Sequence, residues 1–418
     1  MFPSLPQSIR VKATRIGAIL RAVCLGGIAL ATLSAIAQQP SSDSPSSAPT
    51  VRSAAAALAA GDSKRADAEL TAILRADPSD LHALNLLAIL RARQQRNREA
   101  EELFKKAIAI QPDFASAQAG LGLLYLQMGM DNLAIPPLQE ALKLDPGRED
   151  AQRALVSIWR AQAHMAASSG DLEKALALLI SARKLGPDDA DLQFDFGMIA
   201  LRMSLFPDAV NAFKRTLRLR PDDASALYGL GRAQIGLAKF DDAEQSFVQY
   251  VQLRPNDASG HYASGFALQA LQRTAEARDE YEKSIAIQPE QTESYCQLGL
   301  MELDAGDLRA AAKQFGRVLS RAPQHAGALT GMGRVRFQEK NYEEAASLLT
   351  KAVTSNPRLR EAHYYLGLTD GRLGRKDDSK KELAIAAQIE HEEVEKHQNV
   401  LRILNLDQLE APERKPDP

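Results

Sequence analysis

Residues 292–325 read TESYCQLGLMELDAGDLRAAAKQFGRVLSRAPQH, and the pattern in this segment predicts the fold. It holds two runs of about 13 residues with helical periodicity, joined by a short turn at Ala305-Gly306-Asp307. If Thr292 is position 1 of a 34-residue unit, Gly299 falls at position 8, Ala311 at position 20 and Pro323 at position 32. A run of 13 residues is marginal as an isolated helix, so a unit of this kind needs neighbours in order to fold.

The neighbours are present, because the same unit recurs along most of the chain. Position 32 is occupied by prolines spaced 34 residues apart, with one interval of 41 residues: Pro78, Pro112, Pro146, Pro187, Pro221, Pro255, Pro289, Pro323 and Pro357. In this register position 8 is always Ala or Gly, position 20 is Ala or Ser, and position 24 is always large. Small residues at 8 and 20 let two helices cross closely, and the large residue at 24 fills the space beside them. The spacing predicts ten repeats over residues 51–393.

These positions resemble the tetratricopeptide repeat, whose pattern is W-x2-L-G-x2-Y, then A-x3-F, then P. Leu121-Gly122-x2-Tyr125, followed by Ala134, Leu138 and Pro146, fits this pattern, and Trp159 lies at the tryptophan position. The resemblance implies an all-α fold, a right-handed superhelical solenoid of antiparallel helix pairs.

Three irregularities modify the array. The 41-residue interval places seven extra residues at about 149–155, close to two helical turns, and predicts a lengthened first helix in repeat four that starts near Glu149. Pro136 and Pro137 are expected to shorten or kink the second helix of repeat three. In repeat ten His391 replaces the proline, so the second helix is expected to continue as a capping helix over 394–404, followed by a flexible tail at 405–418.

The first 37 residues differ from the rest. A basic segment without acids precedes an apolar run from Ala22 to Ile36, and Ala35-Ile36-Ala37 supplies a small-x-small cleavage pattern. Residues 1–37 are therefore expected to be a signal peptide, with an uncleaved membrane anchor as the alternative, and residues 38–50 a disordered Ser/Pro-rich linker. This predicts an exported protein, periplasmic or secreted. Cleavage leaves Cys296 as the remaining cysteine and about six more acidic than basic residues, which argues against a nucleic-acid partner.

Signatures of catalysis are not found in the sequence. The G-x-G pairs, such as Gly331 and Gly333, have their second glycine at position 8 and are explained by helix packing. No cofactor, no metal site and no enzymatic activity are expected.

The resemblance also implies where a partner would bind, because in this family positions 2, 5, 9, 12 and 13 of the first helices face the concave groove. Carried onto this chain, those positions give in repeats four to seven a strip with Asp191 as its single acid: Arg160, His164, Phe194, Met198, Arg202, Tyr228, Arg232, Tyr262 and Phe266. Further along the same positions hold Arg334, Phe337, Tyr364 and Arg372. Tyr and Arg are enriched at interface hot spots. The alternative is that the aromatic residues at position 5 pack between adjacent first helices.

The sequence thus favours an exported scaffold that holds a protein or peptide in its groove, in an envelope assembly or secretion complex. The strip suits a partner with acidic groups or a free C-terminus. The alternative within the binding class is a structural solenoid that associates with itself.

Overall fold

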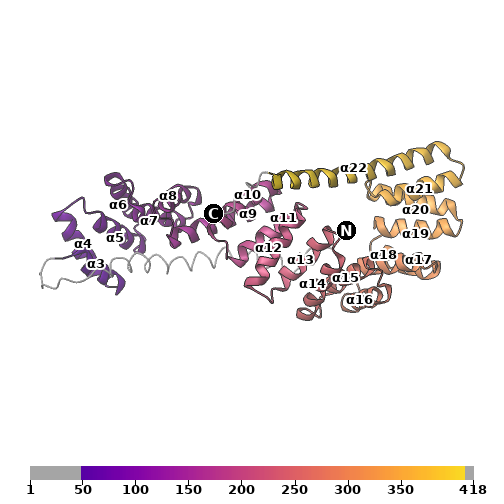
Figure 1. Cartoon of the computed structure of the whole chain (residues 1–418), viewed down its shortest axis with the longest axis horizontal. Coiled ribbons are helices and arrows are strands. Elements are labelled where there is room, and N and C mark those ends of the chain that lie inside the picture. Colours follow the sequence, from indigo (N-terminus) through magenta and orange to yellow (C-terminus); the bar gives the residue numbers. More distant parts are fainter. Residues whose placement is uncertain (1–48, 410–418) are drawn as a thin grey trace, which may run out of the picture. The chain divides into compact units, whose positions relative to one another are not determined.

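A computed structural model describes the backbone of residues 49–409 and the side chains of residues 49–392. Helices α3 to α22 make up this part of the chain and form ten consecutive antiparallel pairs, one per repeat, as Figure 1 shows. The predicted all-α repeat array is confirmed. It forms two compact units, whose described parts are residues 49–246 and residues 247–409. The expected signal peptide and nearly all of the linker lie outside the described residues.

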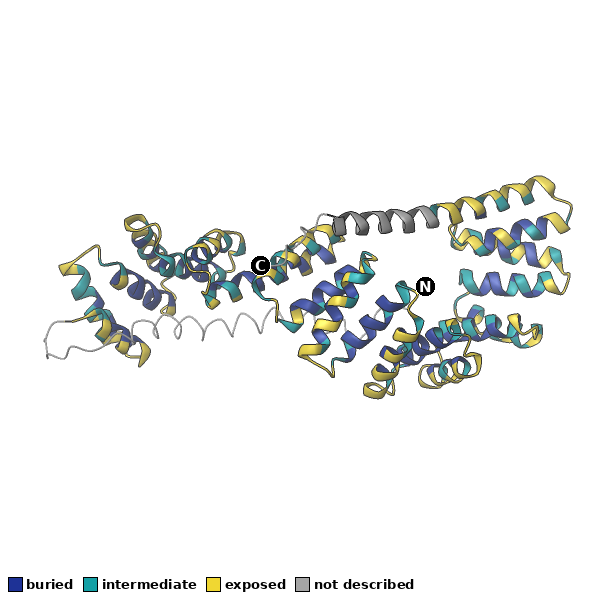
Figure 2. Ribbon diagram, in the orientation of Figure 1, coloured by how far each residue is buried: buried dark blue, intermediate teal, exposed yellow. Residues whose placement is uncertain are grey.

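The helix bounds follow the 34-residue register. The first helices of the ten repeats are α3 (Val51–Ala59), α5 (Leu81–Arg93), α7 (Ala115–Gln127), α9 (Glu149–Ser168), α11 (Ala190–Arg202), α13 (Ala224–Gly236), α15 (Ala258–Ala270), α17 (Thr292–Asp304), α19 (Ala326–Gln338) and α21 (Arg360–Arg372). The second helices are α4 (Ser63–Ala76), α6 (Asn97–Ile110), α8 (Asp131–Leu144), α10 (Leu172–Leu185), α12 (Phe206–Leu219), α14 (Phe240–Leu253), α16 (Thr274–Ile287), α18 (Leu308–Arg321), α20 (Tyr342–Ser355) and α22 (Lys376–Leu409). Buried residues line the faces on which these helices pack (Figure 2).

The close crossing within a repeat depends on the small residue at position 8. A Cβ added to Gly299 would lie 2.7 Å from the ring of Phe315, and one added to Gly122 would lie 2.5 Å from Leu138. In each case the partner is the large residue at position 24 of the same repeat. The packing predicted for positions 8 and 24 is confirmed.

A second close approach joins neighbouring repeats. Gly331, at position 6, lies against Phe315 of the preceding repeat, with 2.3 Å between an added Cβ and the ring. Gly229 approaches Phe213 and Gly120 approaches Phe104 in the same way, at 2.5 Å and 2.4 Å. The first glycine of each G-x-G pair therefore makes room for a phenylalanine of the repeat before it.

The turn between the two helices of each repeat needs a left-handed residue at position 15. In the described residues every repeat has one there: Gly61, Gln95, Gly129, Gly170, Ser204, Ala238, Gln272, Gly306, Lys340 and Gly374. Half of these are not glycine and carry the steric cost of positive φ, as Ala238 does at 54°.

Several of the prolines at position 32 have a hydrogen-bond partner at the same place in the next repeat. These prolines lie in the turn after each second helix, and six residues later a side-chain nitrogen of the next first helix lies within hydrogen-bond distance of the proline carbonyl. The residues are Gln118 (3.3 Å), Gln152 (2.8 Å), Gln193 (2.8 Å), His261 (2.9 Å) and His363 (3.0 Å).

Helix α9 begins at Glu149, as the seven-residue insertion predicts, and has 20 residues where the first helices on either side have 13. It starts at the usual distance from Pro146, and Gln152 makes the usual contact with that proline. In the repeat register α9 ends at position 13, as α7 and α11 do, so the seven additional residues precede position 1, at the N-terminal end of the helix.

Two expectations about helix ends are wrong. The expected shortening of α8 by Pro136 and Pro137 is wrong, because α8 keeps the 14 residues of the other second helices from α4 to α20; the alternative of a kink stays a prediction. The final helix α22 continues past Leu404 to Leu409, so residues 405–409 are helical and not part of a tail. The sequence contains no proline or glycine between Gly374 and Pro412 that would end the helix earlier.

His261 has a hydrogen-bond acceptor at each ring nitrogen. Its Nδ1 lies 2.7 Å from a Glu280 carboxylate oxygen and its Nε2 lies 2.9 Å from the Pro255 carbonyl. A neutral imidazole has one N–H, so both bonds form only with the protonated ring. The hydrogen bond with Glu280 raises the pKa of His261 against the opposing effects of burial and of Lys283. His363 repeats this geometry with Glu382 and Pro357.

We therefore expect part of the stability to be lost as the solution becomes alkaline. Because the folded pKa of His261 exceeds its unfolded value of about 6.5, the stabilisation is complete below that value and disappears as pH rises through the folded pKa. His261→Gln keeps a donor for Pro255, as Gln193 does for Pro187. Urea denaturation at pH 6 and pH 8 should show a smaller pH effect in His261→Gln than in the wild type; equal effects would contradict the assignment.

An electrostatic cluster on the first helices of repeats four and five

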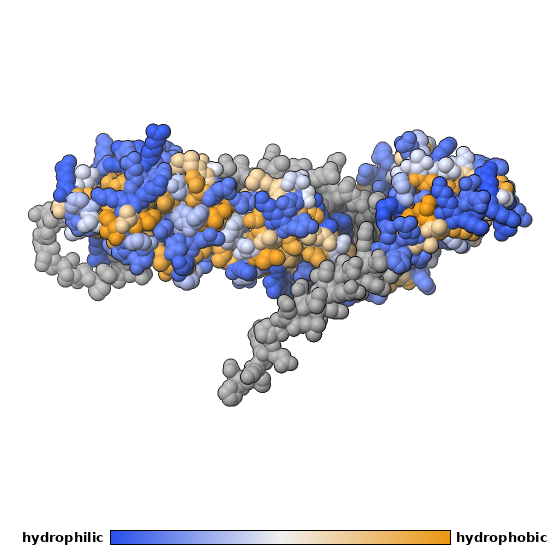
Figure 3. Space-filling model, turned by 90° about the horizontal axis from the view of Figure 1, so that it is seen from above, coloured by the Kyte–Doolittle hydropathy of each residue, from blue (hydrophilic) through white to orange (hydrophobic). Residues whose placement is uncertain are grey.

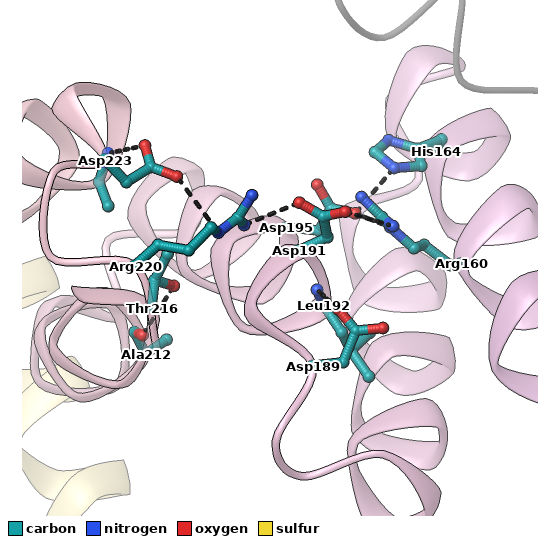
Figure 4. Close-up of polar contacts among 11 residues, drawn as sticks. Arg160, His164, Asp189, Asp191, Leu192, Asp195, Ala212, Thr216, Arg220 and Asp223 are labelled. Carbon is teal, nitrogen blue, oxygen red and sulfur yellow. Dashed lines mark hydrogen bonds and ion pairs between the residues drawn. The ribbon is translucent and has the colours of Figure 1, made fainter. Parts of the chain in front are cut away.

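Arg160 of α9 lies in a cluster of charged side chains that joins the first helices of repeats four and five (Figure 4). Its Nε donates to an Asp195 carboxylate oxygen on α11, and its Nη1 lies 3.4 Å from Asp191. His164, one turn after Arg160, lies 2.9 Å from the same Asp195 oxygen. Arg160 and Asp195 are buried, so each satisfies a charge that could not remain unpaired at this depth.

Asp191 extends the cluster to the turn that follows α12. Its second oxygen accepts a hydrogen bond from Arg220 Nη2 at 2.7 Å, and Arg220 Nε lies 3.7 Å from Asp223 (Figure 4). Asp191 is thus held between two guanidinium groups from different elements.

The charges stabilise one another. Burial acts to lower the pKa of Arg160, but Asp195 and Asp191 outweigh it and raise the value. Burial likewise acts to raise the pKa of Asp191, yet Arg160 and Arg220 hold it below its usual range. Arg160 and Asp191 are therefore both charged at neutral pH.

The exposed face of α11 continues from this cluster. Asp191, Phe194, Met198 and Arg202 are spaced three or four residues apart and share one side of the helix. Phe194 and Met198 are half-buried, and Phe194 packs edge-on to Phe213 at 5.8 Å between centroids. Arg202 is exposed and donates to the Ala167 carbonyl at the end of α9 at 3.2 Å.

The aromatic residues at position 5 do not all face solvent. Tyr228 and Tyr262 are buried, so the packing alternative holds for these two. Tyr262 contacts Tyr281, with 5.8 Å between ring centroids, and burial raises its pKa to about 12. Arg232 and Phe266 are half-buried, and burial lowers the pKa of Arg232.

In residues 247–409 the strip residues still to be placed are Arg334, Phe337, Tyr364 and Arg372. Arg334 bonds Glu361 at 2.7 Å, approaches Asp304 at 3.4 Å and lies over the Tyr365 ring at 5.0 Å. Tyr364 is exposed and meets Tyr365 edge-on. Phe337 is half-buried and also contacts Tyr365, while Arg372 is exposed.

The expectation of a positive strip with one acid is therefore wrong for Arg160 and Arg334, which are neutralised by carboxylates. Asp195 at position 6 pairs with Arg160, and Glu361 at position 2 pairs with Arg334. Neither pairing was among the sequence-based expectations. Asp195 lies outside the positions taken to face the groove, and Arg220 and Asp223 lie in the turn. The available signal was charge complementarity between positions 5 and 6 of neighbouring repeats.

The surface also carries apolar side chains among polar ones (Figure 3). Met165 of α9 is 64% exposed and Leu133 of α8 is 54% exposed. Gln162 of α9 donates a hydrogen bond of 3.2 Å to Asn132 of α8.

The described residues, 49–409 of the chain, also bear on metal ligation, membrane-spanning helices and thiol reactivity. No three His, Cys, Asp or Glu side chains there group as ligands for a metal ion. Within that same part of the chain, helices with the length and apolar character to span a bilayer are not found. Cys296 is buried, and burial raises the pKa of its thiol to about 12.

Models of the tetratricopeptide repeat match residues 52–113, 86–149, 194–258 and 296–360, and a second such model matches residues 258–291. Together these matches cover more than half of the chain. The chain belongs to the tetratricopeptide repeat family. The matches lie on either side of residues 150–193, which contain most of the lengthened α9.

Individual relatives resemble this chain more distantly. A segment of 77 residues is 36% identical to human protein O-mannosyl-transferase TMTC3, and covers 18% of this chain and 8% of that protein. The chain thus spans a small part of that relative's length. Similar solved structures include MamA from Desulfovibrio magneticus RS-1 (22% identity, 41% of this chain, 97% of that chain, TM-score 0.39) and the type IV pilus biogenesis factor PilW (19%, 50%, 96%, 0.45). Another is YrrB (23%, 44%, 95%, 0.35), described as having an unusual peptide-binding site. At these identities and TM-scores the likenesses carry no argument about function.

Proposed function

We propose that this tetratricopeptide repeat protein is an exported scaffold that binds a polypeptide on the first helices of repeats four and five. The observation that carries the proposal is the face of α11, where Arg202 is exposed beside the half-buried Met198 and Phe194. A charged side chain next to apolar ones on a rigid helix is typical of a protein-binding surface. The proposal assigns no catalytic step to the chain.

The exported location is part of the proposal and rests on the N-terminal sequence. A basic segment, an apolar run and Ala35-Ile36-Ala37 support cleavage after Ala37. The mature chain would then meet its partner in the periplasm or outside the cell, in an envelope assembly or secretion complex.

The test is capture of polypeptides from a native envelope extract by the immobilised mature chain, residues 38–418. We expect Arg202→Glu to reduce the captured partner at least about tenfold, since it reverses a charge on the binding face. Lys214→Glu is the matched control, because Lys214 is exposed on the second helix of the same repeat. Equal capture by both variants, with unchanged melting of each, would contradict the proposal.

A further inference from the structure

The cluster of Figure 4 contains two arginines that are held in the same way. Arg160 contacts Asp195 through Nε and offers Nη1 to Asp191, and Arg220 lies beside Asp223 through Nε and offers Nη2 to Asp191. In each pair one aspartate orients the guanidinium group, and a terminal nitrogen is left for Asp191. The result is a two-arginine fork whose single occupant is a side-chain carboxylate.

Asp191 can leave while Arg160 stays in place. The Asp191 side chain is 50% exposed and Arg220 is 43% exposed, whereas Arg160 and Asp195 are each 11% exposed. Asp191 also lies in the first turn of α11, where the helix dipole favours a negative charge even without the arginines. Displacing Asp191 would therefore leave it in a favourable place, with Arg160 still held by Asp195.

We propose that Arg160 and Arg220 form a binding site for a side-chain carboxylate of an acidic polypeptide, and that Asp191 occupies this site in the unbound protein. The partner's carboxylate enters by displacing Asp191 and takes the same two charge-assisted hydrogen bonds. Asp195 and Asp223 are positioning residues for the two arginines.

The rest of the partner would lie along α11. Phe194 follows Asp191 by three residues and Met198 by seven, so both are on the same face of the helix. They provide apolar contacts next to the fork, as an extended acidic segment with interspersed apolar residues would require. This inference rests on the proposed function and specifies the chemistry of the partner.

The experiment measures binding of a fluorescein-labelled, C-terminally amidated peptide of alternating glutamate and serine to the mature protein, by fluorescence anisotropy at low salt. Asp191→Asn removes the competing carboxylate and should bind the peptide about tenfold more tightly than the wild type, the value of one charged hydrogen bond. Asp188→Asn removes the same charge from an exposed turn residue and should leave the affinity unchanged. Adding Arg220→Gln to Asp191→Asn should abolish the gain, and Arg220→Gln alone should weaken wild-type binding.

Two control peptides identify the group that is bound. The glutamine version with an amidated C-terminus should show no gain with Asp191→Asn, and the glutamine version with a free C-terminus should show none either. Equal affinities of Asp191→Asn and Asp188→Asn would overturn the inference, and so would a gain confined to the free C-terminus. If Arg202→Glu abolishes capture while Asp191→Asn changes nothing, the proposed function stands and this site fails; if both variants behave as the wild type, both fail.

Discussion

Replacing Asp195 by alanine is expected to lower the free energy of unfolding by about 3–5 kcal/mol, because it leaves the buried Arg160 guanidinium without its main partner. Asp191 lies 3.4 Å from Arg160, is half exposed and also bonds Arg220, so it cannot take the place of Asp195. Urea denaturation followed by circular dichroism measures the effect.

Two further variants separate this effect from general charge removal. Asp195→Asn retains an oxygen acceptor for Arg160 and should cost less than alanine. Asp188→Ala, at an exposed turn position, should change the stability by no more than about 0.5 kcal/mol. A loss below about 1 kcal/mol for Asp195→Ala would mean that the ion pair does not hold α9 to α11.

Replacing Gly331 by leucine is expected to lower the free energy of unfolding by about 3 kcal/mol, at the upper end of the destabilisation that overpacking causes. The Phe315 ring is fully buried between Gly299 of its own repeat and Gly331 of the next, so it cannot move aside. Gly316→Leu is the matched control, because a Cβ there meets nothing within 4 Å and leucine is the better helix former.

A double-mutant cycle tests the contact itself. Phe315→Leu should recover part of the loss caused by Gly331→Leu, since Leu349, also at position 24, coexists with Tyr365 at position 6 of the next repeat. Independent, additive effects of the two substitutions would show that the ring and the glycine do not share the space assigned to them.

The fold could be predicted from the sequence because its cause is repeated. Small residues at positions 8 and 20 and a proline at 32 recur in register along the chain. Because a chance match would not recur in repeat after repeat, the pattern reflects the packing of the helices. The start of α9 followed from the same register, since seven residues equal nearly two turns of helix. The ends of α8 and α22 did not follow, because the penalty of a proline inside a helix depends on the packing around it, and because helix length without a breaker depends on tertiary context.

The candidate site was harder to predict than the fold. The groove residues were predicted from their positions within single repeats. However, Arg160 is paired with Asp195 in the next repeat, and Asp191 is paired with Arg220 in a turn. Such partners are set by how neighbouring repeats pack, which the register alone does not specify. Tyr228 and Tyr262 were similarly ambiguous, because an aromatic side chain suits a binding face and a core equally.

The most direct test of the account is position-resolved crosslinking of the mature protein in its native envelope extract. A photoreactive amino acid replaces Met198 on the α11 face or, in the control, Lys214 on the second helix of the same repeat. A specific polypeptide adduct is expected at position 198, reduced by an excess of the acidic peptide, and none is expected at position 214. Adducts of equal yield at both positions, or at position 214 alone, would contradict it.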